Sequence, residues 1–117
     1  METIPVSAIA NQSFQVVLGD QDCSFRLYTR PERAGGPLRL YMDLYVGETA
    51  IFYGALCKDG VLLPLSSYMA FEGGLLFVDM EGSEDPEYTG LGDRWSLLYL
   101  TQAEADAYRS GEYVGRS

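Results

Sequence analysis

The sequence predicts a small all-β protein, an antiparallel β-barrel or sandwich of six or seven strands with a short C-terminal helix. Short runs that alternate apolar and polar residues recur along the chain, and turn residues separate them about every eight to twelve positions. The 117 residues include nine tyrosines, a residue type that suits half-buried strands. A helical pattern is confined to the C-terminal end. This length and 47% hydrophobic content favour one domain with one core.

The first predicted element is a β-hairpin. Residues 14–18 form a strand with Phe14, Val16 and Leu18 on one face. Residues 19–22, Gly-Asp-Gln-Asp, supply turn chemistry. In the returning strand, alternate residues form an apolar set (Cys23, Phe25, Leu27) and a polar set (Ser24, Arg26, Tyr28). Two alternating runs joined by such a turn are typical of a hairpin.

The middle of the chain predicts a second pair of strands after a loop at residues 31–37. Apolar residues alternate with Arg39, Tyr41, Asp43 and Tyr45 over residues 38–46, which indicates one buried face and one face that is wet or shared with a partner. Gly47-Glu48 is the predicted turn into a strand at 49–57. Both faces of that strand are apolar, so it is expected to be central or covered on both sides.

The remaining segments are shorter. The sequence predicts a turn at residues 58–60, a short apolar segment at 61–63 and one helical turn at 64–69. Strands are predicted at 75–78 and 95–100, separated by an acidic loop at 81–87. Thr101 and Glu104 form a capping-box pattern before a helix at 103–109 that Gly111 ends. The chain thus divides into a β domain at 1–101 and a short helix with a frayed tail at 102–117.

Period-two spacing predicts which side chains form the core. One set of alternate positions should point inward: Phe14, Val16, Leu18, Phe25, Leu27, Leu40, Met42, Leu44, Ile51, Phe77, Leu97 and Tyr99. Gly54 within a strand predicts a bend or a close backbone approach, and Pro5 predicts an edge or a strand start.

Charge and hydropathy limit the partners. The net charge is −9, which argues against direct contact with nucleic acid or an anionic membrane. Four arginines gather loosely at residues 26–39, and a solvated strand edge explains them better than a binding patch. No apolar run approaches the roughly 20 residues of a membrane helix. The start of the chain does not look like a signal peptide, so synthesis in a cytoplasm is expected.

Little in the sequence points to catalysis, a metal or a cofactor. The chain has no histidine, so histidine ligation and histidine acid–base chemistry are excluded. Cys23 and Cys57 lie in apolar strands and are expected to be reduced and buried. Asp43 lies on the polar side of its predicted strand and is expected to be solvated. The acidic loop offers oxygen ligands for Ca²⁺ but lacks EF-hand order, so a solvated loop is the favoured interpretation.

Three stretches together resemble the phage baseplate plug family, small β proteins of contractile-tail baseplates. The first is Ile4-Pro5-Val6 followed by Gln12-Ser13-Phe14-Gln15-Val16. The second is Leu40-Tyr41-Met42-Asp43-Leu44-Tyr45, followed by Ile51-Phe52-Tyr53-Gly54-Ala55-Leu56. The third is Pro86-Glu87-Tyr88-Thr89-Gly90-Leu91-Gly92, followed by Trp95-Ser96-Leu97-Leu98-Tyr99-Leu100. The order and the spacing of these stretches together carry the resemblance.

The resemblance implies a virion structural protein that plugs or adapts the central hub of a tail baseplate. Its expected partners are hub and tail-tube proteins, and the chain is expected either to self-associate, with a trimer favoured, or to dock as three copies on a trimeric hub. Tyr41 and Tyr45 are the candidate interface residues, because tyrosine is enriched in interface cores. An alternative is a stand-alone module that binds carbohydrate or peptide through Tyr41, Tyr45, Tyr53 and Trp95. A small enzyme using paired carboxylates is the least favoured interpretation.

Overall fold

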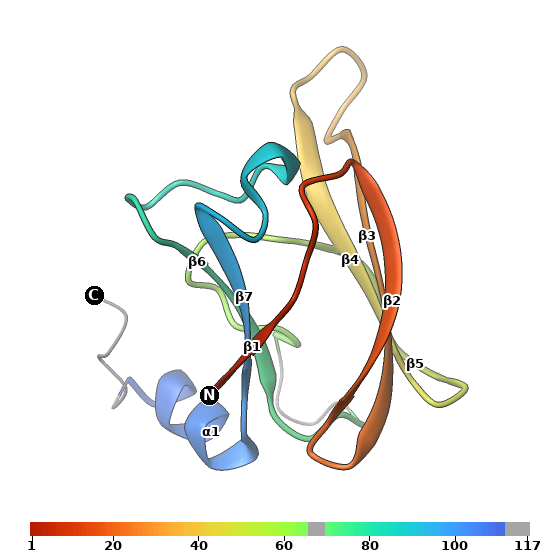
Figure 1. Ribbon diagram of the computed structural model, residues 1–117, viewed down its shortest axis with the longest axis vertical. Coiled ribbons are helices and arrows are strands. Elements are labelled where there is room, and N and C mark those ends of the chain that lie inside the picture. The colour runs from red at the N-terminus through yellow and green to blue at the C-terminus, as the bar shows by residue number, and fades with distance from the viewer. Residues whose placement is uncertain (66–69, 112–117) are drawn as a thin grey trace.

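The computed structural model describes residues 1–65 and 70–111, and these residues form a two-layered β structure with one helix (Figure 1). One antiparallel sheet has the order β2-β3-β4-β5, and the other has the order β1-β7-β6. The sheets stack as a sandwich and do not close into a barrel. The elements within the described residues are β1 (Glu2–Ile4), β2 (Asn11–Leu18), β3 (Gln21–Pro31), β4 (Leu38–Val46), β5 (Thr49–Leu56), β6 (Gly74–Asp79), the 3-10 helix η1 (Tyr88–Gly90), β7 (Trp95–Leu100) and α1 (Gln102–Arg109).

The first hairpin confirms the predicted pairing of β2 with β3. Gly19 and Asp20 have φ angles of 55° and 65°, the left-handed values that a tight hairpin turn requires. Leu18 pairs with Gln21 across this turn, and the register continues without a break to Asn11 opposite Tyr28. Gly47, with φ 58°, starts the corresponding turn between β4 and β5.

The core between the sheets confirms the predicted register. Ten of the expected inward residues are buried: Leu18, Phe25, Leu27, Leu40, Met42, Leu44, Ile51, Phe77, Leu97 and Tyr99. Phe14 and Val16 point the same way but are only partly buried. Cys23 and Cys57 are free thiols, each 1% exposed, as expected. Burial raises the pKa of the Cys23 thiol to about 11.

The prediction that β5 is central or covered on both sides is wrong. The strand lies at an edge of its sheet, next to β4 alone. The apolar run of β5 does not show the alternation typical of an edge strand, because two register shifts interrupt its pairing with β4. Tyr53 and Gly54 lie together opposite Asp43, and Gly54 has φ 60°, as the expected bend requires. Tyr53 therefore points outward and is 64% exposed, while Ile51 remains buried.

The N-terminus contributes a strand that the sequence did not suggest. β1 pairs with β7, and Ile4 reaches the core with 1% exposure. Pro5 does mark an edge strand, but it follows the end of the strand and does not start it. Of the expected helical turn at 64–69, residues 66–69 lie outside the described residues, as do residues 112–117, where a frayed tail was expected.

Helix α1 covers the outer face of the three-stranded sheet (Figure 1). Its capping box is formed, because the Thr101 hydroxyl accepts from the Glu104 amide at 3.3 Å and Glu104 accepts from the Thr101 amide at 2.9 Å. Ala105, fully buried, packs with Leu62, Leu76 and Leu100 in a second small core. The described residues contain no helix that is long and apolar enough to span a membrane.

Candidate interaction surface

The outward face of the four-stranded sheet carries aromatic and cationic side chains instead of an apolar cover. Strand alternation directs them outward from the positions opposite the core residues. We call this surface the tyrosine–arginine face. Its members are Arg26, Tyr28 and Arg30 on β3, Tyr41, Asp43 and Tyr45 on β4, and Tyr53 on β5.

Asp43 lies at the centre of the tyrosine–arginine face and is only 7% exposed. Its Oδ1 accepts hydrogen bonds from the Tyr28 hydroxyl at 2.9 Å and from the Gly54 amide at 2.7 Å. The Arg26 guanidinium lies 3.8 Å from Oδ2. The bulge in β5 supplies the Gly54 donor, since it turns that N–H toward the carboxylate. The sequence-based expectation of a solvated Asp43 is therefore wrong, because neighbouring side chains cover it.

Two arginines stack on the tyrosines around Asp43. The Arg26 guanidinium carbon lies 4.6 Å from the Tyr28 ring centroid. Arg30 lies 4.6 Å from the Tyr41 ring and 5.7 Å from the Tyr28 ring. Tyr28 and Tyr41 face one another at 6.0 Å with an interplanar angle of 23°. Burial and the hydrogen bond to Asp43 both raise the pKa of the Tyr28 hydroxyl.

Among the described residues, the ion pairs formed by side-chain cations involve Arg26, Arg39 and Arg94, and none involves Arg30. Stacking holds the Arg30 guanidinium in a defined orientation while its charge stays available to a partner. The surface thus presents positive charge on a chain whose net charge is −9.

Tyr45 and Tyr53 form the outer end of the face. Their hydroxyl oxygens lie 2.8 Å apart in a hydrogen bond, and their rings meet edge to face at 5.5 Å. The shared hydrogen bond raises the pKa of the Tyr45 hydroxyl. Paired rings of this kind offer a rigid amphipathic surface, which is the character of residues that dominate protein interfaces.

The site residues predicted from the sequence differ in their exposure and in the sheet on which they lie. Tyr45 is half-buried, but Tyr41 is 7% exposed beneath Arg30, so the expected exposed row of Tyr41 and Tyr45 is wrong for Tyr41. Trp95 lies on the other sheet at 3% exposure, and the structure does not bring it together with the tyrosines.

Sequence reasoning missed the roles of Arg26, Tyr28 and Arg30. They alternate along β3 in phase with the polar set of β4, and Tyr28 pairs with Tyr41 across the strands. This shared alternation was the signal in the sequence from which their place on the same face could have been predicted. The contact between Gly54 and Asp43 gave no such signal, because it depends on the register shifts.

The acidic loop is organised around Arg94. The Asp79 carboxylate, fully buried, accepts two hydrogen bonds of 2.8 Å from Arg94 and bonds of 2.9 Å from the Glu81 and Glu84 amides. The Arg94 guanidinium holds the pKa of Asp79 well below its usual range. Within the described part of the chain, no three or more His, Cys, Asp or Glu residues gather in a way that could hold a metal ion.

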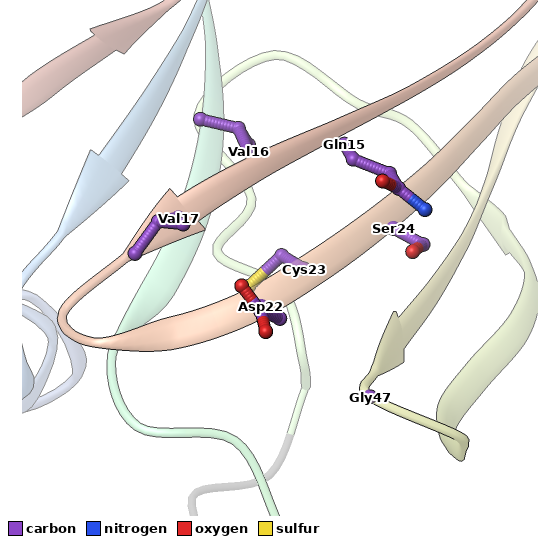
Figure 2. A pocket seen from close by; sticks show the side chains of 7 residues that line it. All are labelled: Gln15, Val16, Val17, Asp22, Cys23, Ser24 and Gly47. Atoms are coloured by element: carbon purple, nitrogen blue, oxygen red, sulfur yellow. The ribbon is translucent and has the colours of Figure 1, made fainter.

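A shallow hollow lies beside the tyrosine–arginine face, between the β2–β3 hairpin and the turn after β4 (Figure 2). Its volume is about 500 Å³. The side chains of Gln15 and Ser24 lie side by side on neighbouring strands, with Asp22 further along β3.

Comparison with known proteins places the chain in a protein family. A search of curated proteins gives no match to the chain. One family model matches residues 1–103, and this family is described as "Cyanophage baseplate Pam3 plug gp18". The matched region includes both sheets and extends into the start of α1. Since it covers most of the 117 residues, the chain belongs to this family of phage baseplate plug proteins.

Proposed function

We propose that this protein closes or adapts the central hub of a contractile-tail baseplate, and that it acts by packing against other proteins without catalysis. Membership of the baseplate plug family supports a structural role in the tail baseplate. The observation that carries the proposal is the open tyrosine–arginine face, whose side chains are held in place around the buried Asp43.

The tyrosine–arginine face is suited to docking on a hub or tail-tube protein. Tyrosine and arginine are enriched among the residues that contribute most to interface affinity. The stacked pairs are already ordered, so a partner would immobilise fewer free rotamers when it binds. Tyr45, Tyr53, Arg26 and Arg30 would make the contacts, while Tyr41 supports Arg30 from below. Three copies on a trimeric hub are the arrangement we propose.

A double substitution of Tyr45 and Tyr53 to Ser tests this proposal. Both members of one hydrogen-bonded pair are removed, so neither hydroxyl is left without its partner. We expect the domain to remain folded and its copy number in purified tail particles to fall at least about tenfold, as measured by quantitative mass spectrometry. Met80→Ser is the matched control, because Met80 is also 64% exposed but lies outside the face.

Two results would contradict the proposal at different levels. Normal incorporation of the double variant would show that the tyrosine–arginine face is not the contact surface. Particles that lack the wild-type protein altogether would rule out the baseplate role itself. A cooperative thermal unfolding transition, measured beforehand, shows that the double variant is folded.

A further inference from the structure

The free edges of the two sheets differ in how they are protected. The sheet orders leave β1, β6, β2 and β5 at the edges. β1 is only three residues long. Residues 59–63 cover β6 through hydrogen bonds that include two of 2.7 and 2.8 Å between Leu63 and Leu75. β5 is broken by two register shifts. Short edges, covering segments and bulges are the usual protection against unwanted strand pairing.

β2 has none of these protections. It is eight residues long and contains no charged residue and no proline. All eight residues pair with β3 in unbroken register. Leu18 and Gln21 flank a two-residue turn and therefore form a hydrogen-bonded pair. By alternation, the N–H and C=O groups of Ser13, Gln15 and Val17 point away from β3, toward the free edge.

The core is incomplete beside this edge. Phe14 and Val16 point inward from β2 but remain half-buried, whereas Phe25 and Leu27 on β3 are 2% and 0% exposed. Val17 on the opposite face is 59% exposed. An additional strand beside β2 would bury the open flank of Phe14 and Val16 and would cover Val17.

The charges around β2 indicate what kind of strand fits. Asp20 and Asp22 are exposed at the hairpin end, and Asp22 lines the hollow of Figure 2. No side-chain ion pair within the described residues involves either of them. A second copy of this chain would bring its own net charge of −9, so repulsion disfavours it. A segment with a Lys or Arg near Asp20 and Asp22 is electrostatically complementary.

We infer that an extended segment of another baseplate protein adds to the edge of β2 as a fifth strand. The segment has apolar residues at alternate positions and a basic residue near Asp20 and Asp22. Backbone hydrogen bonds to Ser13, Gln15 and Val17 hold it, as in other cases of strand addition. The inference rests on the proposed baseplate function for the source of the partner, but it concerns a surface separate from the tyrosine–arginine face.

Gln15→Pro tests this inference. The backbone N–H of Gln15 points to the free edge of β2. Proline therefore removes a donor for the partner, while the hydrogen bonds between β2 and β3 remain. Ala50→Pro is the matched control, because Ala50 pairs with Tyr45 beside the turn and its N–H points to the free edge of β5. We expect Gln15→Pro to lower incorporation into particles at least about tenfold and Ala50→Pro to leave it unchanged.

Cross-linking identifies the occupant without relying on the stability of a proline variant. A photoreactive benzophenone amino acid replaces Val17, and the same residue at position 50 serves as the control. We expect irradiated particles to show a cross-link from position 17 to another baseplate protein. A cross-link to a second copy of this chain, or none, would overturn the inference, as would normal incorporation of Gln15→Pro. Absence of the wild-type protein from particles would instead rule out the baseplate role on which it rests.

Discussion

The outer faces of the two sheets differ in whether the chain itself covers them. On the three-stranded sheet, outward positions carry Leu76 and Leu98, and the chain covers them with its own helix. On the four-stranded sheet, the equivalent positions carry Tyr28 and Tyr45, and no described segment forms a second core over them. The strand alternation is the same in both sheets. The difference lies in whether the outward residues are apolar or are aromatic and able to form hydrogen bonds.

This contrast separates stability from recognition. An apolar outer face is usually covered, because a large exposed apolar patch favours aggregation. A face of tyrosine, arginine and a satisfied aspartate tolerates water and still offers large rings to a partner. Substitutions on the covered face should therefore affect folding, and those of exposed tyrosines and arginines on the open face should mainly affect assembly.

The largest effect is expected from Leu76→Ala on the covered face. Leu76 is 2% exposed and packs beneath α1 with Ala105 and Leu100. Removing its methyl groups leaves a cavity, and the free energy of unfolding should fall by about 2–4 kcal/mol. Leu38→Ala is the matched control, since Leu38 is 59% exposed and should change stability by less than about 0.5 kcal/mol. Urea denaturation measures both variants, and equal losses would show that α1 does not form the cover.

A smaller effect is expected from Asp43→Ala on the open face. The substitution leaves the Gly54 amide and the Tyr28 hydroxyl without their acceptor. The expected loss is about 1–3 kcal/mol in the free energy of unfolding, the range for unsatisfied polar groups that are largely buried. Asp43→Asn keeps one acceptor oxygen and should lose less. If both variants were as stable as the wild type in urea, Asp43 would not organise this face.

Much of the fold follows from residue patterns that act locally. Period-two alternation identified the inward side chains of β3, β4, β6 and β7, because one buried face fixes the phase of a strand. Turn residues such as Gly19 and Asp20 fixed the first hairpin. The capping box of Thr101 and Glu104 likewise depends on neighbours in sequence. These features need no knowledge of the rest of the chain.

The parts that were not predicted depend on contacts between distant segments. β1 is a strand because β7 offers it an edge, and its three residues carry little signal of their own. The place of β5 at an edge, and the outward direction of Tyr53, follow from register shifts that alternation does not reveal. The burial of Asp43 depends on Gly54, eleven residues away along the chain. For the same reason, the tyrosine–arginine face was recognised only in part.

The smallest effect on stability, and the sharpest separation of folding from assembly, is expected from Arg30→Ala. The Arg30 guanidinium contacts the rings of Tyr41 and Tyr28 from the exposed side of the sheet. An exposed cation–π contact contributes about 0.5–1 kcal/mol, so the urea transition should move only slightly. Incorporation into particles should nevertheless fall, because the charge that Arg30 offers to a partner is lost. Arg30→Lys keeps the charge but loses the planar stack, and it should restore incorporation only in part. Full incorporation of the alanine variant would show that the open face binds through its tyrosines alone.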